Sequence, residues 1–402
     1  MTLRVRVSMS IVLLVIASLL AAPPARAASP AAASQAAASS TAASQAAAAP
    51  GDVVSAEPTT VYLLPGKLLE VPVDAWHLLY RSTAATGQLN TVSGTLLVPK
   101  AAYPLGRRPV IGYATGTHGL GDQCAPSVSM SQGREAELAL VSLFLLKGFA
   151  VAITDYEGLG TPGQHTYMVG VSQGHAVLDS IRAATRVPGA NLSDRAPVAV
   201  MGYSQGGASA GWAGQLQPSY APELRLKGVA AGGVPADLRA VATHLDGDQN
   251  FGLAAAAGVG LDAAYPELDL EADLNDRGKA LLGDAADDCV GELEDKLAGL
   301  RFADLSPVDL LDLPKWRVRL SENRLGATPP KAPVFLYHAQ GDEIIPQAVG
   351  ATLRSEYCRA GANVRWTSLP ANSHVLGAVE GGPLAIEWLA LRVLGLPAVG
   401  NC

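Results

Sequence analysis

The sequence has few charged residues and no surplus of positive ones. Of its 402 residues 16% are charged, and 29 lysines and arginines stand against 36 aspartates and glutamates, for a formal net charge of -7. A protein that neutralises nucleic-acid phosphates needs a basic face. The composition therefore excludes nucleic acid as the main partner, while 49% hydrophobic residues are enough to bury a large core.

Long hydrophobic runs are also rare, and the one that matters stands near the start. Arg4 and Arg6 precede an apolar run from Ile11 to Leu20, and Ala25-Arg26-Ala27 follows as a small-x-small cleavage pattern. The run is too short to span a bilayer, so the layout predicts a signal peptide over residues 1–27 and a secreted, extracellular protein. A retained anchor is the alternative, and the mature chain has no transmembrane segment in this interpretation.

Residues 28–51 lack both charge and large apolar side chains and repeat the phrase ASQAAA. Such a segment has nothing to bury, so we expect a disordered linker.

The rest of the chain alternates two patterns. Two β-type runs, VDAWHLLYRST and NTVSGTLLVP, come first and can pair as an antiparallel edge. Buried-looking strands then alternate with helical spacing: RPVIGYAT, FAVAITDY, PVAVMGYS, LKGVAAGG, APVFLYHA and VRWTSLP are the strands, and REAELALVSLFLLKG and GHAVLDSIRAATR are helices. This alternation predicts an α/β fold with a mostly parallel sheet flanked by helices.

Residues 236–323 break this rhythm. They are rich in aspartate and glutamate, contain no convincing strand, and include the apolar tract FGLAAAAGVGL from Phe251 to Leu261. We expect a helical cap inserted between a first core part, 52–235, and a second, 324–402. Phe251 and Leu253 are the candidates for covering a ligand site and binding an apolar chain, unless the tract is only the packing face of a buried helix. The acidic residues fit a solvated face better than a metal site.

Ser204 stands in the phrase PVAVMGYSQGGASAGW, where an apolar run gives way to Gly202, Gly206 and Gly207. Glycines around a serine between a strand and a helix are typical of a nucleophile elbow, which lifts the hydroxyl clear of the sheet. A tight turn that happens to contain serine is the alternative. A nucleophilic serine also needs a base and an acid, in the chain order serine, acid, histidine.

That order is fulfilled once in the sequence. The strand-like APVFLYHA ends in Gly341-Asp342, and only one histidine, His374, comes after Asp342. Taken singly, Asp342 could be a turn residue and His374 a surface residue. Together with Ser204 they predict a catalytic triad. His338, inside the strand before Asp342, fits a core histidine or one that supports the site.

An oxyanion hole would use the backbone N–H of Gln205 and one from the glycine-rich loop ATGTHGLGDQCAPS. Thr117 and His118 are the candidates for the second donor, and an ordinary loop role for His118 stays open.

The phrases GTHGLGDQCAPS, GYSQGG, YHAQGDEIIP and the late NSH together resemble the secretory lipases of the Candida antarctica lipase A type, over roughly residues 65–402. The resemblance implies an α/β-hydrolase with a helical cap that acts on lipid esters without metal or cofactor. It also implies an acidic side chain near the oxyanion hole, for which Asp122 is the candidate. An esterase or polyester hydrolase, a serine peptidase of the same fold and a non-catalytic surface-binding module are the alternatives, and we assume a monomer whose substrate is an ester or a lipid, met in solution or at a lipid-water interface.

The four cysteines have no CxxC pair, so disulfides are expected in a secreted chain rather than a zinc site. A bridge between Cys358 and Cys402 would tie down the C-terminal end, which leaves Cys124 with Cys289. This second pair matches the pattern that the resemblance suggests.

Overall fold

The computed structural model describes residues 48–402, which form one compact unit. The predicted signal peptide and most of the predicted linker lie outside the described residues. Within 48–402, no helix is both long enough and apolar enough to cross a membrane.

Eleven strands are described. In chain order they are β1 (Val53–Pro58), β2 (Tyr62–Leu64), β3 (Leu68–Glu70), β4 (Val73–Thr83), β5 (Leu89–Pro99), β6 (Val110–Ala114), β7 (Ala150–Tyr156), β8 (Pro197–Tyr203), β9 (Arg225–Gly232), β10 (Val334–Ala339) and β11 (Val364–Leu369). Nine of them form one sheet in the order β1-β4-β5-β7-β6-β8-β9-β10-β11, and β2 and β3 form a separate hairpin. The six strands β6 to β11 pair in parallel with one another, whereas the β1–β4, β4–β5 and β5–β7 pairs are antiparallel.

The mostly parallel sheet agrees with the sequence prediction, and each predicted strand is present. The prediction missed β1, which is the outermost strand, and the β2–β3 hairpin. The sequence VVSAEP of β1 is half-buried to exposed and carries no clear alternation, so its pairing with β4 depends on the neighbour rather than on its own pattern.

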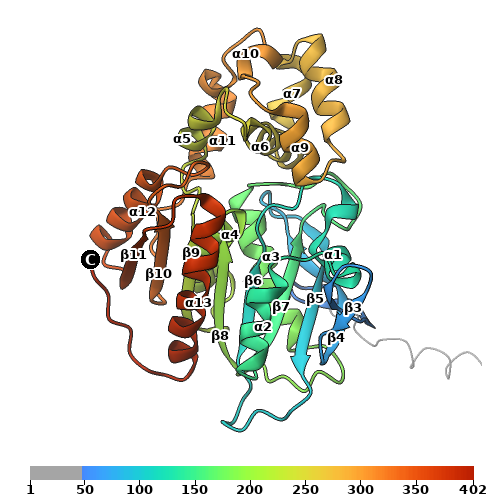
Figure 1. Cartoon of the computed structure of the whole chain (residues 1–402), viewed down its shortest axis with the longest axis vertical. Helices are drawn as coiled ribbons and strands as arrows, with labels where there is room; N and C mark the ends of the chain where they lie inside the picture. Colours follow the sequence, from blue (N-terminus) through green and yellow to red (C-terminus); the bar gives the residue numbers. More distant parts are fainter. Residues whose placement is uncertain (1–47) are drawn as a thin grey trace, which may run out of the picture. The chain divides into compact units, whose positions relative to one another are not determined.

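Helices cover both faces of the sheet (Figure 1). The helices of the core are α1 (Pro126–Gln132), α2 (Leu138–Leu146), α3 (Gly170–Ala184), α4 (Gln205–Tyr220), α12 (Gln347–Arg359) and α13 (His374–Val393), with a short 3-10 turn η1 (Asp122–Cys124). The buried residues of α2 and α13 belong to one apolar cluster, and those of α3, α4 and α12 belong to another. Within β8, Val198 and Val200 contribute to the second cluster and Ala199 and Met201 to the first, as alternation along a strand requires.

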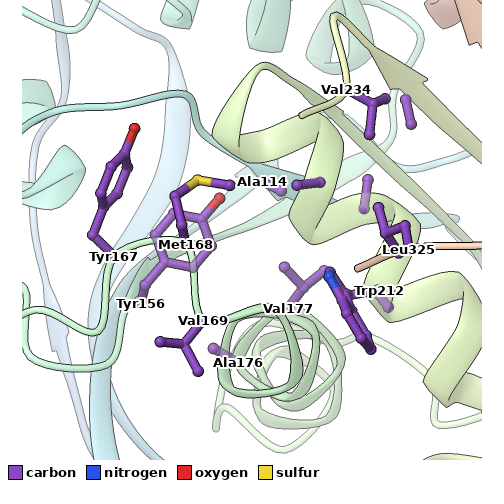
Figure 2. Packing of buried hydrophobic residues seen from close by; sticks show 14 of the residues in the cluster. Ala114, Tyr156, Tyr167, Met168, Val169, Ala176, Val177, Trp212, Val234 and Leu325 are labelled. Carbon is purple, nitrogen blue, oxygen red and sulfur yellow. The ribbon is translucent and has the colours of Figure 1, made fainter. Parts of the chain in front are cut away.

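Helices α3 and α4 pack closely against each other within the apolar cluster that they share. Trp212 of α4 lies beside Val177 of α3 (Figure 2). A Cβ at Gly174 would lie 3.0 Å from the Trp212 backbone carbon, so this glycine lets the two helices pack in contact.

Between β9 and β10 the described elements are all helices, and none is a strand. These are α5 (Leu238–Leu245), α6 (Phe251–Ala264), η2 (Pro266–Leu268), α7 (Leu270–Asp273), α8 (Asp276–Ala285), α9 (Val290–Leu297), α10 (Phe302–Leu305), η3 (Leu310–Asp312) and α11 (Pro314–Glu322). We call residues 236–323 the cap; its helices gather at one end of the sheet (Figure 1). Its apolar residues continue the same cluster as α3 and α4.

Candidate active site

Ser204 lies in a sharp turn between β8 and α4. Its backbone has φ 58° and ψ -123°, a conformation that costs a non-glycine residue free energy and that tends to occur at functional sites. The Ser204 N–H donates to the Gly232 carbonyl at 3.0 Å. The strand, turn and helix around Ser204 have the geometry of a nucleophile elbow.

The neighbouring glycines are required by close backbone contacts. A Cβ at Gly202 would lie 2.1 Å from the Gly206 carbonyl oxygen, and a Cβ at Gly206 would lie 2.0 Å from the Ala114 carbonyl oxygen. Neither position has room for a side chain. The turn around Ser204 therefore packs directly on the end of β6, where the oxyanion-side loop begins.

Asp342 and His374 are in contact. The His374 Nδ1 lies 2.9 Å from Asp342 Oδ1 and 2.8 Å from Oδ2, and both residues are buried. Asp342 Oδ1 also accepts the backbone N–H groups of Ile344 and Ile345 at 3.1 and 2.8 Å. Because both carboxylate oxygens only accept, Nδ1 carries the proton and Nε2 is left as the basic nitrogen.

Burial opposes ionisation of Asp342, but hydrogen bonds from His338 and His374 and the backbone N–H of Ile345 outweigh it. The pKa of Asp342 consequently lies well below its usual range. The carboxylate stays charged at neutral pH, as support of a cationic histidine requires.

His374 is fixed by two further contacts. Its backbone N–H donates to Glu343 Oε2 at 2.8 Å, and its carbonyl accepts from the Tyr203 hydroxyl at 2.6 Å. A Cβ on Gly233 would lie 3.1 Å from His374 Cε1, and the carbonyl of the neighbouring Gly232 accepts the Ser204 N–H. His374 and Ser204 thus flank the same two glycines.

Within residues 48–402 no hydrogen bond joins Ser204 Oγ to His374. Such bonds are often long in a substrate-free enzyme and tighten on binding.

The oxyanion-side loop, residues 115–125, lies against the turn at Ser204. Gln205 is the first residue of α4, so its N–H has no acceptor within the helix. The Thr117 hydroxyl lies 2.8 Å from the Tyr167 hydroxyl, and Tyr167 lines the same pocket as Ser204 and Gln205. The His118 side chain instead makes contacts with Gly116 and Glu135. The Thr117 side chain thus lies nearer the pocket than that of His118, and the backbone N–H groups of both residues stay candidates for the second donor.

Two buried glutamates hold this loop, and sequence reasoning missed them. Glu137 Oε1 accepts the Gly116 N–H at 2.6 Å, and Oε2 accepts the Tyr113 hydroxyl at 2.7 Å. Glu135 Oε2 lies 2.6 Å from His118 Nε2. The sequence REAEL had suggested a helix, but α2 begins only at Leu138, and the turn before it directs both carboxylates toward the loop.

The protonation states follow from this packing. Burial opposes a charge on His118, but Glu135 and Glu137 outweigh it and raise the pKa of His118 to about 9. Burial, together with the charge of Glu135, raises the pKa of Glu137 above its ordinary value. The loop therefore rests on a buried cluster of one cationic histidine and two acids at neutral pH.

Asp122 does not take the acidic position suggested from sequence. Its carboxylate is exposed and accepts the Gly160 N–H at 2.8 Å. Glu135 and Glu137 are the acids in contact with residues 116–118. Asp122 was favoured because it stands in the loop itself, whereas the acids that reach the loop come from the segment after α1.

An apolar pocket leads from Ser204 and Gln205 into the cap. Its walls come from Tyr167, Met168, Pro235, Leu238, Val241, Ala242, Leu245, Leu253, Ala254, Ala255, Ala257, Gly258, Leu261, Leu270, Leu274, Leu282, Phe302, Leu305, Leu310, Leu311, Trp316, Leu320, Ile344 and Ile345. Leu253 is thus part of the wall. Phe251 is not; it is fully buried and packs edge-on against Phe302. The tract in α6 combines the two roles that its sequence left open.

The cap is joined to the oxyanion-side loop covalently and by backbone pairing. Cys124 and Cys289 form a disulfide. Beside it, the Leu120 N–H donates to the Asp288 backbone carbonyl at 2.8 Å, and the Val290 N–H donates to the His118 backbone carbonyl at 2.9 Å. A second disulfide joins Cys358 to Cys402. Both bridges link the cysteines that the sequence analysis paired.

Comparisons with known proteins agree with this arrangement. A family model described as secretory lipase matches residues 126–401. A secreted triacylglycerol lipase of Malassezia globosa is 30% identical over 86% of this chain and 76% of its own length. A Mycobacterium tuberculosis protein with "inactive lipase" in its name is 29% identical over 82% of this chain and 76% of its own. The crystal structure of Candida antarctica lipase A in its closed state superposes with a TM-score of 0.78 at 26% identity, covering 87% of this chain and 84% of that one.

Proposed function

The chain belongs to the secretory lipase family, and from this premise we propose that it hydrolyses carboxylic esters of long acyl chains, acylglycerols among them, with Ser204, His374 and Asp342 as a catalytic triad. One observation carries the proposal. Ser204 and Gln205 stand in the wall of a pocket that is otherwise almost entirely apolar and that extends into the cap. A reacting ester at Ser204 can therefore bury a hydrocarbon chain in the cap.

The geometry supports the following reaction. Ser204 Oγ attacks the ester carbonyl carbon while His374 Nε2 takes its proton, and the negative charge moves to the carbonyl oxygen. The N–H groups of Gln205 and of either Thr117 or His118 bind that oxygen. The intermediate collapses, His374 returns the proton to the leaving alcohol, and an acyl group stays on Ser204. Water then repeats the sequence with His374 as base and releases the acid.

Asp342 contributes without exchanging a proton. Its charge stabilises His374 while that residue is cationic, and its contact with Nδ1 keeps Nε2 basic. An Asp342 that remains ionised to low pH is suited to this role.

The family and the N-terminal sequence both favour export. A signal layout over residues 1–27 precedes the described part of the chain, and we propose that the mature protein acts outside the cell. Four cysteines paired in two disulfides fit an oxidising compartment.

The decisive experiment measures hydrolysis of p-nitrophenyl esters and glycerides of increasing acyl length by the full mature chain and by Ser204→Ala. The native protein should prefer long chains, and Ser204→Ala should lose more than about a thousandfold in kcat with unchanged circular dichroism. Equal activity of a folded Ser204→Ala protein would rule out the triad. A preference for acetyl esters would favour an esterase, and cleavage of peptides alone would favour a peptidase.

The pocket has its own test in Leu253→Asp, with Val318→Asp as the matched control. Val318 is an exposed cap residue, whereas Leu253 lines the pocket. A charge at Leu253 should lower activity on long-chain esters about tenfold and leave short esters nearly unchanged, because only a long chain must cross it. Equal losses on both esters would mean that the pocket does not hold the acyl chain.

A further inference from the structure

A second histidine contacts the carboxylate of Asp342. His338 stands in β10, four residues before Asp342, and is fully buried. Its Nε2 lies 3.2 Å from Asp342 Oδ2 and 2.8 Å from the Ile345 carbonyl oxygen. Asp342 therefore lies between two imidazoles, although the reaction described above uses only His374.

The hydrogen-bond partners determine the form of His338. A carboxylate oxygen and a carbonyl oxygen only accept, so Nε2 must carry a hydrogen. The other nitrogen, Nδ1, is buried and has no partner among the described residues. A Cβ on Gly350 of α12 would lie 2.5 Å from it. A hydrogen on Nδ1 would have no acceptor in this space, so the geometry favours the tautomer with its hydrogen on Nε2.

The two histidines thus differ in what they can do. His374 starts a helix at the site, and its Nε2 is free to take a proton. His338 donates through Nε2, which lies 2.8 Å from the Ile345 carbonyl oxygen and 3.2 Å from Oδ2, the carboxylate oxygen that His374 contacts at 2.8 Å. A hydrogen-bond donor lowers the proton affinity of a carboxylate.

We propose that His338 is a positioning residue for the reaction: as a donor it fixes the Asp342 carboxylate and keeps the proton of the Asp342–His374 pair on His374. This inference depends on the proposed triad.

The other groups around Asp342 are consistent with this role. They are the backbone N–H groups of Ile344 and Ile345, the carboxylate of Glu343, which is occupied by the His374 N–H, and the Tyr203 hydroxyl, which donates to the His374 carbonyl. Trp366 of β11 packs near the His338 ring, with centroids 6.3 Å apart. No lysine or arginine makes a salt bridge to Asp342 within residues 48–402. Hydrogen bonds from His338 and His374 are the contributions that lower the pKa of Asp342 against the effect of burial.

Two substitutions separate positioning from packing. His338→Phe keeps a planar ring of similar size but has no donor. His338→Gln places an amide NH2 near the position of Nε2 and restores the donor. Both variants and the native chain are compared on a soluble short ester, with kcat and KM measured from acidic to neutral pH, alongside thermal unfolding.

His338→Phe should lower kcat about tenfold to a hundredfold with little change in KM, because a displaced carboxylate misorients the base. The acidic limb of kcat/KM should also move to higher pH by about half a unit to one unit, since without the donor the dyad binds its proton more tightly. His338→Gln should recover most of the loss in kcat and return the limb toward its native position.

Two results would overturn the inference. One is a His338→Phe protein with native kcat and a native acidic limb. The other is equal loss in His338→Phe and His338→Gln, with both acidic limbs unshifted, because a packing role predicts no rescue by the donor. Ser204→Ala in the same assay keeps the two proposals apart: if it retains activity the triad itself fails, whereas an inactive Ser204→Ala with an unaffected His338→Phe rejects only the role of His338.

Discussion

The two loops that flank Ser204 are held in different ways. The acid loop, residues 340–346, is fixed mainly from the core: the Gln340 and Gly341 N–H groups donate to the Leu369 and Ala371 carbonyls, and His338 contacts Asp342 from β10. The cap adds one contact, between His244 Nε2 and the Glu343 carbonyl oxygen at 2.9 Å. The oxyanion-side loop is fixed from two sides, by the Glu135–Glu137 cluster below it and by the cap through Cys289. The position of the Asp342 carboxylate thus depends mainly on the sheet, whereas the position of the oxyanion donors also depends on a covalent link to the cap.

The largest effect is expected in the acid loop. Asp342→Asn should lower kcat by roughly a hundredfold to ten-thousandfold, because the amide cannot stabilise a cationic His374 and favours the wrong tautomer. Steady-state kinetics on a soluble ester provide the measurement. Asp122→Asn is the matched control, since Asp122 is exposed and makes its contact to Gly160; it should stay within about twofold of the native rate. A large loss in the control would restore Asp122 as the oxyanion-side acid.

The next effect should come from the cluster below the oxyanion-side loop. Glu137→Leu removes the acceptor of the Gly116 N–H and should lower kcat about tenfold to a hundredfold, less than full loss of an oxyanion donor. KM should change little, because the donors act mainly in the transition state.

Glu137→Gln is its control, because the amide oxygen can still accept from Gly116. Comparable losses in the two variants would show that the charge of Glu137, rather than its hold on the loop, is what matters.

Removal of the two disulfides should have different effects on kcat, and both effects should be smaller than those above. Replacing Cys124 and Cys289 by serine should lower kcat a few-fold and lower the melting temperature, since the cap and the loop lose their covalent link. Replacing Cys358 and Cys402 should lower the melting temperature alone. The bridges close segments of 165 and 44 residues, which corresponds to about 5 and about 4 kcal/mol in the chain-entropy model. A drop in kcat for the C-terminal pair would erase this distinction.

The smallest effect is a pH dependence of stability. The pKa of His118 is raised to about 9 in the folded chain, so its stabilising contribution is full below about 6.5, the ordinary value, and is lost as pH rises through about 9. The melting temperature of the native chain should fall more between pH 7 and pH 10 than that of His118→Asn. Parallel curves for the two proteins would mean that His118 carries no charge-dependent stabilisation.

The parts of the site that follow directly from strands could be predicted from sequence. Ser204 and Asp342 each come just after a buried strand, and a parallel sheet brings such residues to one edge. His374 was identified because one histidine alone follows Asp342. Their catalytic roles stay predictions until the variants are measured.

Other features had no local signal. Glu135 and Glu137 reach the loop only because the turn before α2 directs them there, and two glutamates in a helix-like phrase fit a solvated face equally well. Phe251 and Leu253 stand two residues apart in a tract that is apolar on all sides, so periodicity could not tell which side chain faces the pocket. The contact of His338 with Asp342 depends on the path of the acid loop, which places Ile345 and Asp342 around one nitrogen.

The Cys124–Cys289 bridge also bears on how the chain matures. Its cysteines are 165 positions apart, and the segment between them includes β7, β8 and β9, which bring the cap to the oxyanion-side loop. Closing this long loop in an unfolded chain costs more entropy than closing the shorter one between Cys358 and Cys402. We therefore expect Cys124 and Cys289 to pair mainly in chains whose central sheet has assembled. A chain trapped with thiol reagents during refolding should then show the Cys358–Cys402 bridge first.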